Sequence, residues 1–101
     1  MKRGYTVILS PDPVEGGYTV ICPAMPGAIT EGDSREGALA AMAEVMSIWL
    51  EVAAEHGEEP LEETPKLVAE KVAEVLDDRA EEGWDFQIET TTVEPETSAV
   101  A

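Results

Sequence analysis

Two short stretches near the start of the chain, residues 5–10 and 18–22, are rich in β-branched and aromatic side chains. Such a composition predicts β-strands, and in the first of them Tyr5, Val7 and Leu9 are spaced to lie on one face. The proline-rich stretch 11–13 ends the first strand because proline cannot donate to a strand ladder, and Gly16–Gly17 supplies the turn back. We therefore predict a β-hairpin, followed by a short third strand over residues 28–31.

The pattern changes to a helical period after the third strand. We expect a helix over residues 34–56, with Asp33 as its N-cap and Glu36 placed as in a capping box. Apolar residues recur in it every three or four positions, which is typical of a helix lying on a sheet. The stripe expected to be buried consists of Leu39, Met42, Met46, Trp49 and Ala53, widened by Ala38, Ala41, Val45, Ile48 and Val52.

The second half of the chain predicts one more helix and one more strand. Thr64 followed by Pro65 is typical of a helix start, and that helix is expected to end near Gly83. Apolar and polar side chains then alternate from residue 84 and predict a fourth strand over residues 84–93, with an apolar face that needs a neighbour. We assign that face to completion of the sheet or to self-association, through Trp84, Phe86 and Ile88.

The order β-β-β-α-α-β predicts an α+β fold, with both helices packed on one face of an antiparallel sheet. A length of 101 residues suits a single domain. We assign residues 1–93 to that domain, with residues 61–93 forming its acidic helix and strand. Residues 94–101 are expected to be a flexible tail.

Charge limits the classes of partner. The formal net charge is −16, and residues 51–101 hold sixteen acidic residues against only Lys66, Lys71 and Arg79. Such a surface repels nucleic acid and anionic membranes and attracts basic proteins. The alternative interpretation is that the acidic surface serves only solubility, or adaptation to salt or heat.

The sequence offers little catalytic chemistry. Its one cysteine, Cys22, and one histidine, His56, cannot form a disulfide or a zinc site of nitrogen and sulfur ligands. Cys22 is expected to be a buried apolar residue, and His56 to stabilise the end of the long helix. We predict a protein that is not an enzyme and has no catalytic residues, metal site or cofactor. Without a recognisable signal peptide or membrane span, a cytoplasmic location is expected.

An ordered series of motifs runs through residues 5–60: YTVILSPD from Tyr5, GGYTVICPAMPG from Gly16, TEGDSRE from Thr30 and WLE from Trp49. In this order they resemble the HicB antitoxin-like family. The resemblance implies a partial RNase H-like fold without nuclease carboxylates, and neutralisation of HicA, a small basic RNA-cleaving toxin.

Many HicB-like proteins also carry a C-terminal DNA-binding module, and residues 61–101 depart from that pattern. They predict an acidic helix and an acidic strand, so we expect no direct binding to DNA or RNA.

Three hypotheses about function follow. The first is an antitoxin-like module that binds a small basic protein, the HicA-like toxin. The second is a stand-alone oligomer with a regulatory or structural role, and the third is a metal-dependent hydrolase that uses clustered carboxylates. For the first, the residues expected to bind the partner are acids near the two ends of the long helix: Glu31, Asp33, Glu51, Glu55, Glu58 and Glu59.

Overall fold

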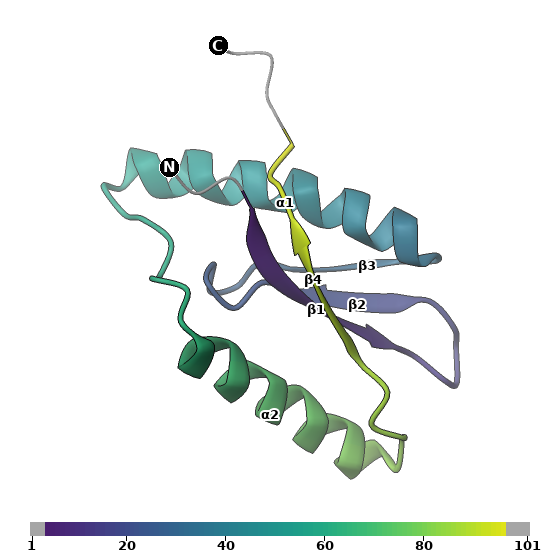
Figure 1. The fold of residues 1–101 in the computed structure, drawn as a ribbon. Coiled ribbons are helices and arrows are strands. Elements are labelled where there is room, and N and C mark those ends of the chain that lie inside the picture. Colours follow the sequence, from purple (N-terminus) through teal and green to yellow (C-terminus); the bar gives the residue numbers. More distant parts are fainter. Residues whose placement is uncertain (1–3, 97–101) are drawn as a thin grey trace.

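The computed structural model describes residues 4–96, which form a four-stranded sheet and two helices (Figure 1). The elements follow the predicted order, and most boundaries agree within about one residue, except at the fourth strand. The strands are β1 (Tyr5–Pro11), β2 (Tyr18–Ile21), β3 (Ile29–Gly32) and β4 (Glu89–Val93), and the helices are α1 (Arg35–Glu55) and α2 (Pro65–Glu82).

All neighbouring strands are antiparallel, in the order β3-β2-β1-β4. The predicted hairpin pairs Leu9 with Val20, and β4 pairs with the other side of β1, where Leu9 faces Glu89. The α+β class and the antiparallel sheet are therefore confirmed. β3 and β4 form the two edges of the sheet.

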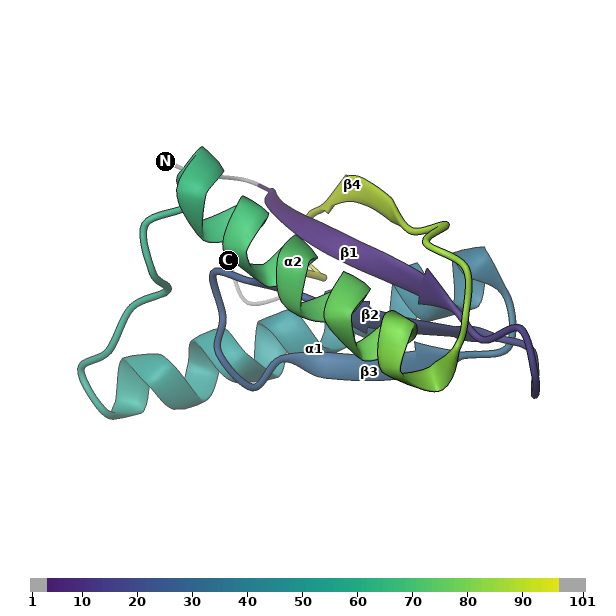
Figure 2. The ribbon, with the colours of Figure 1, turned by 90° about the horizontal axis from the view of Figure 1, so that it is seen from below.

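The two helices lie on opposite faces of the sheet, so the prediction that both pack on one face is wrong. Figure 1 shows the sheet between α1 and α2, and Figure 2 shows α2 in front of β1. Val7 and Leu9 belong to the core cluster with α1, whereas Thr6 and Ser10 hydrogen-bond to residues of the α2 side. The physical reason lies in β1, where Ile8 is fully buried between Val7 and Leu9. Consecutive buried residues are typical of a strand covered on both faces.

The face of α1 toward the sheet is the main core. Ala38, Met42 and Met46 are fully buried with strand residues such as Val20. The predicted stripe is therefore confirmed at its centre. Its widened flank is not: Ile48 and Val52 are 59% and 47% exposed, because they point past the sheet. Cys22 is buried, as predicted.

Trp49 lies at the border of this core and is half-buried. Its indole Nε1 donates a hydrogen bond of 3.0 Å to the Pro26 carbonyl. We expect Trp49→Ala to lower the free energy of unfolding by about 1.5–3 kcal/mol, less than for a fully buried ring. Trp49→Phe, which keeps the ring and loses the donor, should cost about 0.5–1.5 kcal/mol. Urea unfolding measures both, and equal losses would contradict the packing role of the ring.

The N-terminus of α1 is capped by Ser34 and not by Asp33. The Ser34 side chain accepts a hydrogen bond of 3.0 Å from the Gly37 backbone N–H, and its backbone is extended, as an N-cap requires. Thr64 caps α2 as predicted, with Pro65 at the first helical position.

Residues 84–88 are not part of a strand, so the predicted strand 84–93 is wrong over its first half. β4 begins only at Glu89. The backbone N–H of Trp84 donates to Arg79, and Arg79 in turn holds Asp85, which keeps this segment off the ladder. A local polar network has overridden the alternating pattern.

The predicted tail is ordered at its start. Glu96 donates its backbone N–H to the Ala43 carbonyl at 3.0 Å, and its own carbonyl accepts from Ser47 Oγ at 2.6 Å. The chain is thus fixed to α1 as far as residue 96. The rest of that prediction, residues 97–101, lies outside the described residues.

Within residues 4–96, α1 alone has the length and apolar composition to cross a membrane, with a mean hydropathy of 1.4. Its packing is that of a core helix, since Ala38, Met42 and Met46 are buried against the sheet. Its outer surface carries Glu44, Glu51 and Glu55. The described residues form a globular fold that is not clearly that of a membrane protein.

An ion pair joins the start of α1 to β4, and it makes stability depend on pH. Arg35 donates a hydrogen bond to the Glu89 carboxylate, and this bond lowers the pKa of Glu89 below its ordinary value. The positive charge of Arg35 lowers that pKa further. A lowered carboxyl pKa adds stability that is complete above the unfolded pKa of about 4.3 and is lost as pH falls through the folded pKa. We therefore expect Arg35→Met to raise the Glu89 pKa in a carboxyl NMR titration, and Arg35→Lys to raise it less. An unchanged Glu89 pKa in Arg35→Met would contradict the ion pair.

Candidate partner-binding groove

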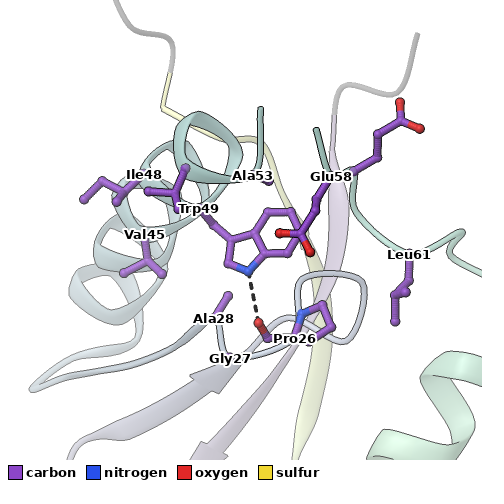
Figure 3. Close-up of a pocket in the computed structure, with 11 residues that line it drawn as sticks. Pro26, Gly27, Ala28, Val45, Ile48, Trp49, Ala53, Glu58 and Leu61 are labelled. Atoms are coloured by element: carbon purple, nitrogen blue, oxygen red, sulfur yellow. Dashed lines mark hydrogen bonds between the residues drawn. The ribbon is translucent and has the colours of Figure 1, made fainter. Parts of the chain in front are cut away.

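An open apolar groove of about 520 Å³ runs along the outer flank of α1. One wall is the helix itself, and the other is formed by the turn before β3 and by the linker between the helices (Figure 3). We call it the α1 groove; its larger apolar lining residues are Val45, Ile48, Trp49, Val52, Pro26 and Leu61.

The turn opposite α1 is fixed by its own backbone hydrogen bonds. The N–H of Cys22 donates to the Ala28 carbonyl, and the N–H of Ala28 donates to the Met25 carbonyl, at 3.1 and 2.9 Å. Pro26 projects its carbonyl at the Trp49 indole (Figure 3). The Pro-Ala-Met-Pro-Gly sequence of residues 23–27 therefore forms a wall that its own backbone hydrogen bonds hold in place.

The linker wall is fixed at both ends. Gly57 adopts a left-handed backbone, with φ of 69°, which ends α1 and lets the Glu58 N–H donate back to the Ala53 carbonyl at 2.8 Å. Farther on, the Leu61 N–H donates to the Ala24 carbonyl at 2.8 Å. The side chains of Glu58 and Leu61 are thereby held at the groove (Figure 3).

The groove gathers apolar surface that the described part of the chain leaves uncovered. Ile48, Val52 and Leu61 line it, and they are 59%, 47% and 48% exposed. Clustered exposed apolar side chains mark interaction sites far more often than single ones do. The large apolar residues that are exposed elsewhere, Val14, Ile29 and Phe86, do not line this groove.

Four of the six acids predicted to bind a partner border the groove. Glu58 and Glu59 line it directly. Glu51 and Glu55 are exposed on α1, three positions after Ile48 and Val52, so they are neighbours of these residues on the helix surface. The arrangement is an apolar strip with carboxylates beside it.

The other two predicted acids, Glu31 and Asp33, lie at the opposite end of α1. They border a separate polar hollow together with Asp12 and Glu15 of the hairpin turn. Most of the 21 residues of α1 lie between Asp33 and Glu51, which is roughly 25 Å of helix. The structure therefore does not bring the six acids together into one site.

The three residues assigned to self-association differ in exposure and in their neighbours. Phe86 is 62% exposed, and Ile88 is half-buried. The Trp84 ring stacks on the Arg79 guanidinium, whose Cζ lies 5.3 Å from the centroid of the ring. Within residues 4–96, no group of three His, Cys, Asp or Glu side chains is placed to hold a metal ion.

Sequence reasoning missed the groove because it counted Val45, Ile48 and Val52 as core. A signal was present: the apolar arc of α1 is wider than one sheet can cover. A helix with such a broad arc needs a second covering surface, and the described residues supply only part of one.

Comparisons of the chain with models of protein families, with curated proteins and with solved structures found no match in any of the three.

Proposed function

We propose that this protein is a HicB-like antitoxin, or an antitoxin-related protein, that binds and neutralises a small basic RNA-cleaving protein of HicA type in the cytoplasm. The observation that carries the proposal is the α1 groove, an apolar surface bordered by Glu51, Glu55, Glu58 and Glu59. The motif series of residues 5–60, which resembles HicB-like proteins with their partial RNase H-like fold, supports it.

The chemistry of the partner explains why this surface suits it. A protein that cleaves RNA needs a positive face to hold phosphates. An acidic protein that is already folded can cover such a face without losing entropy to ordering. Exposed ion pairs contribute only about 0–1 kcal/mol each, so firm binding also needs apolar contacts, and the groove offers them.

The test is co-expression with a small basic protein encoded beside this gene. We expect the neighbour to be toxic alone and harmless with this protein. Replacement of Glu51, Glu55, Glu58 and Glu59 by lysine should abolish protection. A matched control changes four exposed acids of α2, Glu70, Asp77, Asp78 and Glu81, to lysine; it alters the net charge equally and should still protect.

The association rate should also fall steeply with added salt, while dissociation changes less. The proposal would be refuted if the protein encoded beside this gene is not toxic, or if it remains toxic when the present protein is produced in excess. Equal loss of protection in both lysine variants would show that net charge, and not this surface, is responsible.

A stand-alone oligomer with a regulatory or structural role is the second candidate. Two unpaired sheet edges, β3 and β4, together with the exposed Phe86 favour it. Sedimentation of the purified protein tests it: a concentration-independent monomer would rule out self-association, and a dimer lost on Phe86→Ser would support it.

A further inference from the structure

We propose that the α1 groove receives an amphipathic helix of the basic partner, with two or three aliphatic side chains in the groove and Lys or Arg at the flanking positions. The inference rests on the proposed function and gives its binding face a location and a chemistry. It makes apolar contact, and not charge attraction alone, the basis of recognition.

The dimensions of the groove suit one helix face. Val45, Ile48 and Val52 span about two turns of α1, or roughly 10–12 Å along its axis. A partner helix with apolar residues at positions i, i+4 and i+7 presents a stripe of the same length. The groove volume of about 520 Å³ can hold several aliphatic side chains.

The state of the backbone around the groove favours a helix over an added strand. A strand would bind through unpaired main-chain groups. Here the turn uses its own groups: Ala28 N–H donates to Met25, its carbonyl accepts from Cys22, and the Pro26 carbonyl accepts from Trp49. The groove therefore offers side chains, which is how a helix is recognised.

Charge decides which kind of helix fits. Glu58 and Glu59 line the groove from the linker, and Glu51 and Glu55 are exposed on α1 next to Ile48 and Val52. A second copy of this chain would bring the same acids and a net charge of −16 to the contact, and like charges across an interface oppose binding. A basic helix gains attraction from these carboxylates, and its apolar residues still reach the groove.

The experiment titrates the full-length protein with synthetic capped helical peptides in a calorimeter. The probe carries leucine at i, i+4, i+7 and i+11 with lysine at the flanking positions. Two control peptides replace all lysines by glutamate or all leucines by serine. We expect the first peptide to bind, with both controls at least about tenfold weaker.

Protein variants locate the binding site. Ile48→Ser and Val52→Ser, which change exposed side chains of α1, should each weaken binding of the lysine–leucine peptide about tenfold or more. Val14→Ser is the matched control, because Val14 is an exposed aliphatic residue on the distant hairpin turn; it should change binding less than twofold. Absence of binding, or equal effects of Val14→Ser and Ile48→Ser, would overturn the inference.

The same variants in the co-expression assay separate this inference from the proposed function. Protection that survives in the Ile48→Ser and Val52→Ser variants would overturn the groove as the docking site and leave the antitoxin function standing. Peptide binding that depends on Ile48, combined with a neighbour that is not toxic, would support the helix-binding groove and refute the antitoxin function. A concentration-dependent dimer lost on Ile48→Ser would identify a second copy as the occupant and overturn the inference.

Discussion

Replacing Arg79 by methionine should lower the free energy of unfolding by about 2–4 kcal/mol, because each buried acceptor that loses its donor costs about 1–3 kcal/mol. Arg79 is only 2% exposed, although it is a cation on the last turn of α2. Its guanidinium donates to Ser10 Oγ at 2.8 Å, to the Pro11 carbonyl at 2.5 Å, and to both the carbonyl and the carboxylate of Asp85.

These bonds join the end of β1, which is far away in the sequence, to α2 and to the segment that directly follows it. Arg79 ties α2 to the end of β1 and to residues 84–88, and its guanidinium also stacks on Trp84. Methionine fills a similar volume but leaves the carbonyls of Pro11 and Asp85 without this donor. A domain of this size is stabilised by about 5–15 kcal/mol in total, so the loss is a large part of its stability.

Urea unfolding of three variants tests this prediction. Lys71→Met removes an exposed cation from the same helix, where Lys71 Nζ lies 3.2 Å from Glu74, and should cost less than about 1 kcal/mol. Arg79→Lys keeps the charge without the planar fork and should fall between the two. A loss in Arg79→Met no greater than in Lys71→Met would show that the buried network contributes little.

The positions of the elements could be predicted because their signals are local. The turn at Gly16–Gly17, the Thr64 cap with Pro65, and the β-branched and aromatic residues of β1 are each signals from a few neighbouring residues. The side of the sheet that each helix covers is not local. It depends on how the linker carries the chain past the sheet, and the only hint in the sequence is the run of three apolar residues from Val7 to Leu9.

The acidic residues of the candidate site could be predicted from the sequence, but the shape of the groove could not. Acids at the end of the long helix were expected to bind a partner, and Glu58 and Glu59 do border a groove. The apolar lining was misassigned because helical periodicity cannot distinguish a residue under a sheet from one beside it. Likewise, a basic residue near a helix end suggests a favourable dipole interaction, and nothing in the sequence alone shows that Arg79 is buried.

Replacing Gly32 by alanine should lower the free energy of unfolding by about 3 kcal/mol, the upper part of the range for overpacked positions. Gly32 ends β3 where α1 crosses it most closely. A Cβ at this position would lie 2.5 Å from the Ala38 backbone nitrogen, 2.6 Å from its Cα and 2.9 Å from its Cβ. The nearest atoms belong to the backbone of α1, so the helix must move away from β3. This movement also disturbs the contacts of Met42 and Met46 with the sheet.

Two further variants show whether close approach is the cause. Gly57→Ala places a Cβ in open space at a left-handed backbone, so it should cost only the conformational penalty of about 1 kcal/mol. Adding Ala38→Gly to Gly32→Ala removes the side-chain clash but not the backbone one, so it should restore little stability. Thermal and urea unfolding should therefore rank Gly32→Ala well below Gly57→Ala in stability. Full rescue by Ala38→Gly, or equal stability of the two alanine variants, would contradict the contact between β3 and the backbone of α1.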